Sequence, residues 1–194
     1  MRLNDPLYDS FEFDGVVYPL DLSFNKVLDT FDCLRDDVLS DLDKAQSCVG
    51  IVTGNFDIEF PLVVDLWVHI RKNFIDSQED DGIQYDIKGN PMPKVEDNET
   101  TPRLIDLEKD AEYIYASFQQ AYGISLLKVQ NQLSWPEFKA LLNALPDSTI
   151  MQQIIQIRAW KPSDGGSQEY RQKMRKLQAK YRLEDEGEEE DYES

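Results

Sequence analysis

The chain has 194 residues, 41% of them hydrophobic, and a net charge of −18, so its length and composition are those of a globular protein with a buried core. No stretch has the apolar length of a membrane span, and the first ten residues lack the apolar core of a signal peptide. Cys33 and Cys48 have no metal-ligand spacing and form no disulfide framework. We therefore expect a cytoplasmic protein with no membrane partner.

Charge is unevenly distributed along the chain. Residues 1–110 hold 25 acidic and 10 basic side chains, whereas residues 111–183 hold 5 acidic and 10 basic ones. Residues 184–194, "EDEGEEEDYES", hold eight acids and no base. Because phosphate contacts need a basic face, we expect no nucleic-acid partner for the surface as a whole. We interpret 184–194 as a solvated, disordered tail; the alternative is that it shields the basic segment before it until a partner arrives.

The N-terminal elements begin with "FEFDGVVYPL", where Asp14 and Gly15 tolerate the positive φ angles of a tight turn. We predict a small β-hairpin whose second strand ends at Pro19. The next segment changes to three- and four-residue spacing, which predicts an amphipathic helix capped by Ser23. Its apolar face would consist of Phe24, Val27, Leu28, Phe31, Leu34 and Val38.

Two further helices are expected before a long loop. One covers 41–52 and ends near Gly54. The other lies in "FPLVVDLWVHIRKNF", with Pro61 in its first turn and a core face of Leu62, Leu66, Trp67, Ile70 and Phe74. Residues 76–106 are polar and contain three prolines, which predicts a surface loop or a disordered insertion.

Helical signals return in "LEKDAEYIYASFQQAYGI", which should stop at Gly123. Ser134 and Glu137 form a capping-box pattern that opens the next helix. The break "PDST" and a last apolar helix ending near Trp160 follow it. The apolar stretch 133–158 is therefore read chiefly as core.

The segment from about 167 to 183 predicts a basic amphipathic helix. Its apolar strip is narrow, which suits either a partner surface or an edge of the helix's own domain. Met and Tyr side chains adapt well to a helix groove, so we take the strip as the candidate partner-binding site. The strip consists of Tyr170, Met174, Leu177 and Tyr181.

Together these elements predict a mainly α protein with an N-terminal hairpin, a long surface loop and a disordered acidic tail. We expect a helical domain over 1–160 with the loop at 76–106, a peripheral basic helix over 161–183 and the tail over 184–194. The predicted core includes Phe31, Leu34, Trp67, Phe118, Phe138, Leu142 and Ile154.

Residues that carry chemistry are sparse. The one histidine, His69, lies on an apolar helix and is interpreted as a packed side chain. A calcium loop over 77–88 fails because Lys88 stands where a bidentate glutamate is needed. Asp36, Asp37, Asp41 and Asp43 are read as solvated helix charge rather than a cation site. We therefore expect no enzyme, no catalytic residue, no metal and no cofactor.

One ordered set of motifs resembles a known family. "YASF", "YGI", "LSWPEFKALLNAL" and "QIIQIR" follow one another over about fifty residues, and "FDGVVYPLDLSFNKVLDTFD" is similar in kind. The set resembles the gene-product-fifteen family of siphophages that infect Gram-positive bacteria. Residues 76–106 and the tail from 184 show no match.

The resemblance implies a tail assembly chaperone, because the family is encoded just before the tape-measure gene. Its partners would be the tape-measure protein, other copies of itself and the tail-tube protein, in the host cytoplasm. The family offers no catalytic residues. Two alternatives stay open: a structural virion component, such as a tail-completion or connector subunit, and an acidic DNA mimic.

Overall fold

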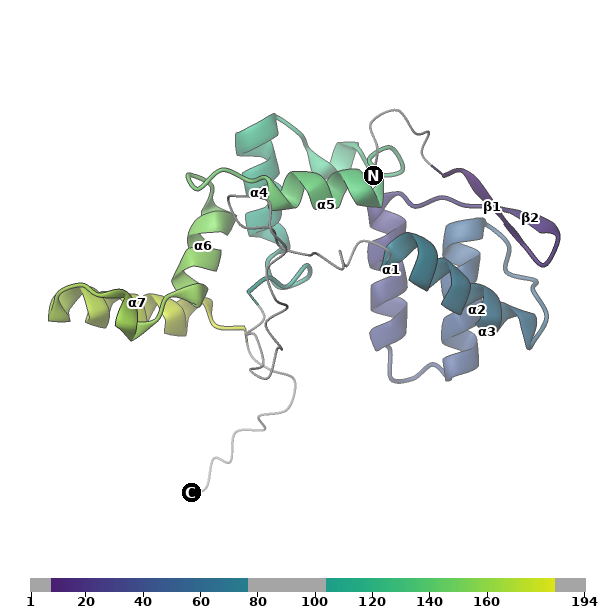
Figure 1. Ribbon diagram of the computed structural model, residues 1–194, viewed down its shortest axis with the longest axis horizontal. Coiled ribbons are helices and arrows are strands. Elements are labelled where there is room, and N and C mark those ends of the chain that lie inside the picture. The colour runs from purple at the N-terminus through teal and green to yellow at the C-terminus, as the bar shows by residue number, and fades with distance from the viewer. Residues whose placement is uncertain (1–7, 77–103, 184–194) are drawn as a thin grey trace, which may run out of the picture. The chain divides into compact units, whose positions relative to one another are not determined.

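The structure is a computed structural model that describes residues 8–76 and 104–183, and it confirms a mainly α fold with one small N-terminal hairpin (Figure 1). The predicted loop over 76–106 falls almost wholly, and the predicted tail wholly, outside the described residues. The elements are β1 (Ser10–Phe13), β2 (Val16–Pro19), α1 (Phe24–Arg35), α2 (Asp41–Thr53), α3 (Leu62–Ile70), α4 (Ala111–Tyr122), α5 (Trp135–Asn143), α6 (Ile150–Ala159) and α7 (Gln168–Tyr181).

The described residues form two compact units. The first unit contains residues 8–76 and 127–140, and the second contains residues 104–126 and 141–183. The predicted division at residue 160 stays a prediction.

The hairpin forms as expected. Asp14 and Gly15 take φ angles of 50° and 76°, and β1 pairs antiparallel with β2. Phe11 lies opposite Tyr18, and its ring stacks on that of His69 at 5.7 Å. The aromatic face of the hairpin thus packs against the residues at the end of α3.

Helices α1, α2 and α3 pack in sequence within the first unit, α1 on α2 and α2 on α3 (Figure 1). Two predictions about α1 were wrong. Helix α1 ends at Arg35, so Val38 lies beyond its apolar face and is 92% exposed. Ser23 holds the N-cap position, but its hydroxyl donates to Asp21 instead of accepting a helix N–H.

The start of α5 belongs to the first unit and packs against α1 through aromatic rings. Phe138 stacks on Phe24 at 5.1 Å and on Trp135 at 5.6 Å, while Phe31 meets Trp135 edge-on. The Trp135 indole N–H donates to the Ile75 carbonyl over 3.4 Å. The apolar opening of the "LSWPEF" segment therefore has a core function.

The capping box at the start of α5 is present. The Ser134 N–H donates to a Glu137 carboxylate oxygen at 3.0 Å, and the Glu137 N–H donates back to the Ser134 hydroxyl at 3.4 Å. Residues 22–24 pair with 133–135 next to this box. The Trp135 N–H donates to the Leu22 carbonyl, and the Phe24 N–H to the Leu133 carbonyl. The N-termini of α1 and α5 are thereby fixed side by side.

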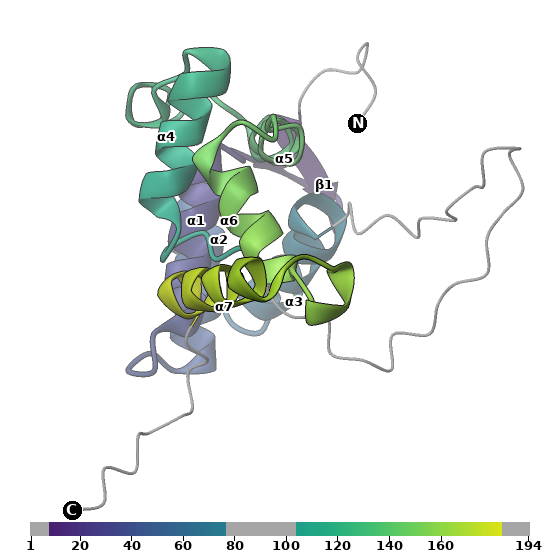
Figure 2. The same cartoon turned by 90° about the vertical axis from the view of Figure 1, so that its left-hand side faces the viewer.

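In the second unit, α4 and α7 both pack against α6 (Figure 2). Helix α4 stops at Gly123, whose φ of 67° is the left-handed stop predicted for it. The hydroxyl of Ser117, on α4, accepts the Met151 N–H at the start of α6 over 3.1 Å. A side chain from another helix therefore satisfies a backbone donor that α6 cannot satisfy itself.

An ion pair also holds the second unit together. The Arg158 guanidinium donates to both carboxylate oxygens of Asp110 at 2.6 and 2.8 Å, and both side chains are buried. It also donates to the carbonyls of Leu104 and Tyr181 at 2.8 and 2.7 Å. One side chain of α6 thus binds Asp110 at the N-cap of α4, the chain before it and the end of α7.

The predicted core is largely present. Five of the seven predicted residues are buried, whereas Phe31 and Leu34 are only half-buried on α1. The buried five are Trp67, Phe118, Phe138, Leu142 and Ile154.

Candidate interaction surfaces

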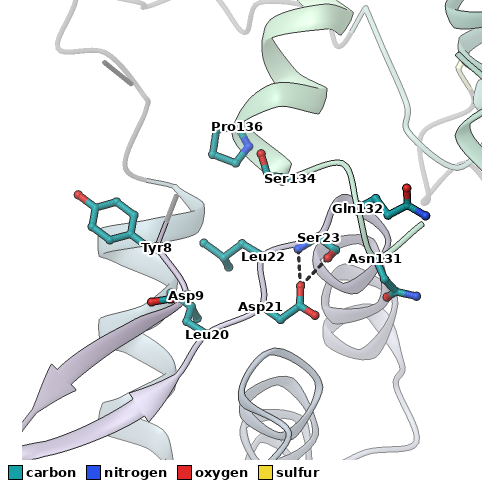
Figure 3. Close-up of a pocket in the computed structure, with 10 residues that line it drawn as sticks. All are labelled: Tyr8, Asp9, Leu20, Asp21, Leu22, Ser23, Asn131, Gln132, Ser134 and Pro136. Atoms are coloured by element: carbon teal, nitrogen blue, oxygen red, sulfur yellow. Dashed lines mark hydrogen bonds between the residues drawn. The ribbon is translucent and has the colours of Figure 1, made fainter. Parts of the chain in front are cut away.

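A cleft opens in the first unit where the hairpin, the start of α1 and the start of α5 meet; we call it the hairpin cleft (Figure 3). Its volume is about 400 Å³. Tyr8 and Asp9 lie on one side of Leu22 and Asn131 and Gln132 on the other, as Figure 3 shows. The cleft is lined by Tyr8, Asp9, Leu20, Asp21, Leu22, Ser23, Asn131, Gln132, Ser134 and Pro136.

The polar groups of the hairpin cleft are engaged with one another. Burial raises the pKa of the Asp21 carboxyl, but the Lys26 ammonium 2.8 Å away and the hydrogen bonds from Ser23 outweigh it, so this pKa lies below its usual value. The Asn131 N–H donates to the Asn25 side chain, whose amide donates back to Asn131.

These bonds fix the starts of α1 and α5. The hydroxyls of Ser23 and Ser134 donate to Asp21 and Glu137, respectively. The arrangement can hold one or two side chains of a partner between apolar and polar walls.

A second surface, which was not predicted from the sequence, lies along α3. The helix sequence "LVVDLWVHI" is apolar on every side apart from Asp65 and His69, yet one side of it faces solvent. Phe60, just before the helix, is 66% exposed, and Val68 is 57% exposed. Val64 and Val68 are four residues apart within α3, so they share one face of the helix, and Val64 is partly exposed. We call Phe60, Val64 and Val68 the α3 strip.

An apolar helix in a globular protein is normally covered on all sides, so the α3 strip is a candidate docking surface. The sequence contained a signal for it. Val64 and Val68 lie opposite the face predicted for the core. A helix that is apolar on both faces must pack against another element or a partner on each of them.

The predicted partner strip on α7 lies on one face of the helix, and that face packs against α6 and other parts of the second unit. Met174 is 8% exposed, and Leu177 and Tyr181 are half-buried. The Tyr181 ring meets the Tyr113 ring edge-on at 6.0 Å. Only Tyr170, at 46%, is largely exposed. The strip therefore supports the fold of the second unit, and partner binding by it stays a prediction.

The residues considered for catalysis or metal binding have structural contacts. His69 lies among the rings of Phe11, Phe13 and Phe74. Burial raises the pKa of the Cys48 thiol to about 12, so the thiol stays protonated.

Acidic residues after α1 and in the first turn of α2 make local hydrogen bonds. Asp36 accepts the Val38 N–H, and Asp43 accepts the Ser40 hydroxyl at the start of α2. In residues 8–76 and 104–183, no three His, Cys, Asp or Glu side chains gather to hold a metal ion. The calcium pattern at 77–88 lies outside the described residues. No helix in the described part is long and apolar enough to cross a bilayer.

The fold and these surfaces define a small, acidic, mainly α protein with exposed apolar and charged faces. The family described as Bacteriophage Gp15 protein matches residues 3–183, and the chain belongs to this family. Membership indicates a structural or assembly role in a bacteriophage. Comparisons with curated proteins and with solved structures gave no match.

Proposed function

We propose that this protein is a tail assembly chaperone. It binds and solubilises the tape-measure protein in the host cytoplasm while the tail-tube protein polymerises, and it is absent from the mature virion. It works without catalysis, cofactor or metal, and it binds neither nucleic acid nor membrane. The observation that carries the proposal is the exposed α3 strip on a protein of a bacteriophage family.

The physical argument starts from the client. A tape-measure protein is a long, apolar-rich helical chain that aggregates when bare. A chaperone for it needs an apolar surface on which a helix can lie and a charged exterior that keeps loaded copies apart. The α3 strip offers the first, with Phe60 and Val68 as exposed apolar anchors. Residues 8–76, with 14 acidic and five basic side chains, offer the second.

The test is co-expression with the tape-measure protein of the same phage. Phe60→Asp with Val68→Asp places two charges on the α3 strip, while the fold survives because both side chains are exposed. We expect the tape-measure protein to move from the soluble to the insoluble fraction.

The matched control is Val17→Asp with Val38→Asp, which changes two exposed valines outside the strip. This control should keep the client soluble. Equal solubility with both double variants would show that the α3 strip is not the client surface. A client that needs no partner for solubility would contradict the chaperone function itself.

A structural virion component is the second candidate, since a connector or tail-completion subunit would also belong to a phage family and expose apolar faces. Mass spectrometry of purified virions separates the two, because a connector is present in fixed copy number and a chaperone is absent. An acidic DNA mimic is the third candidate. Salt-sensitive binding to a DNA-binding enzyme would favour it.

A further inference from the structure

Helix α7 is basic on two sides that differ in chemistry. At 100° per residue, Arg171 and Arg175 fall on one side of the buried Met174, together with Gln168 and Gln172. The lysines fall on the other side. We call the first set the arginine side; the lysine side consists of Lys173, Lys176 and Lys180, and the bases of both sides are exposed.

The arginine side is hollowed. Arg171, Arg175 and the two glutamines line a groove of about 510 Å³ that Gly166 completes at its end. Guanidinium groups offer a planar fork of donors that matches a carboxylate, and the glutamine amides add further donors. The groove therefore suits a chain rich in carboxylates better than the lysine side does.

The chain itself supplies such a segment next to the groove. The eleven residues after Leu183, "EDEGEEEDYES", hold eight acids and no base. An extended chain covers about 3.3 Å per residue. If the tail turns back after Leu183 and runs along α7, Glu186 and Glu188 reach about 10 and 17 Å from Leu183. Arg175 and Arg171 lie about 12 and 18 Å back along the helix, at 1.5 Å per residue.

We propose that residues 184–194 occupy the arginine side of α7 in the same chain. The tail is tied directly to the end of α7, so its effective concentration at the groove is in the millimolar range. A second copy is a weaker competitor, because two chains of net charge −18 repel each other. Occupied in this way, the arginine side is closed to other anions. The proposal is independent of the client in the proposed function.

The test uses full-length chains and a fluorescent peptide of sequence EDEGEEEDYES, with anisotropy at about 50 mM salt as readout. In the amide-tail variant, all eight tail acids are replaced by Gln or Asn. The peptide should bind this variant about tenfold more tightly than the wild type, since a millimolar internal competitor is gone. Raising the salt to about 300 mM should weaken the binding.

Two further variants of the amide-tail chain locate the site. R171Q with R175Q should weaken peptide binding about fivefold relative to K173Q with K176Q, a control that removes the same charge from the lysine side. All chains are compared by circular dichroism, which should show the same helix content.

Three results would overturn the proposal. Equal peptide binding by wild-type and amide-tail chains would show that the tail does not occupy the groove. An equal loss of peptide affinity in the arginine and lysine variants would show that the peptide is held by general charge attraction and not by the groove. A dimer in sedimentation that R171Q with R175Q dissociates, and that the amide tail leaves intact, would assign the groove to a second copy.

Discussion

Removing the Arg158 guanidinium should destabilise the second unit more than any surface substitution does. Arg158→Met keeps the apolar stem of the side chain and removes four hydrogen bonds, two to the Asp110 carboxylate and two to backbone carbonyls. The carboxylate, 2% exposed, is then left as a buried charge without its cation. Breaking a buried pair in this way costs about 3–5 kcal/mol, a large share of the roughly 5–15 kcal/mol that holds a typical protein folded.

Urea unfolding followed by circular dichroism measures the loss, and hydrogen exchange locates it. Exchange should speed up in residues 104–126 and 141–183. The matched control is Arg71→Met, because Arg71 pairs with Asp76 at 2.9 Å with both side chains about half exposed. This change should cost less than about 1 kcal/mol. A loss below about 1 kcal/mol for Arg158→Met as well would refute the reasoning that burial makes the Arg158–Asp110 pair indispensable.

The remaining predictions concern the core, α7, the tail and pH. Phe138→Ala should lower the free energy of unfolding by about 3–5 kcal/mol, and a change below about 1 kcal/mol in urea unfolding would contradict its place in the core. Leu177→Asp with Tyr181→Asp should destabilise the protein if α7 serves the fold; a folded variant that no longer solubilises its client or self-associates would identify the strip as the partner surface. Deleting residues 184–194 should leave the melting temperature nearly unchanged, because exposed ion pairs contribute at most about 1 kcal/mol; a large fall would contradict this. The pKa of Asp21 lies below its usual 3.8, so Asp21→Asn should lower the free energy of unfolding above pH 3.8. The difference in stability between variant and wild type should vanish as the pH falls through the folded-state pKa of Asp21. A difference that does not change with pH would contradict the ion pair with Lys26.

Local signals in the sequence determined where the elements begin and end. The Asp14-Gly15 turn, the stop at Gly123 and the capping box of Ser134 with Glu137 each depend on residues within a few positions of one another. Such signals depend on backbone geometry and local hydrogen bonds, so they hold whatever the rest of the chain does. The basic character of α7 and its narrow apolar strip could also be read in this way.

Tertiary structure alone decided what covers each face. Periodicity shows that α3 has apolar sides, but only packing shows that Trp67 is buried while Val68 is exposed. Ser117 satisfies the start of α6 from 34 positions away, and Arg158 meets Asp110 from 48 positions away. The pattern within one helix does not predict which element packs against it, because the packing partner depends on how elements that are distant in the chain pack together.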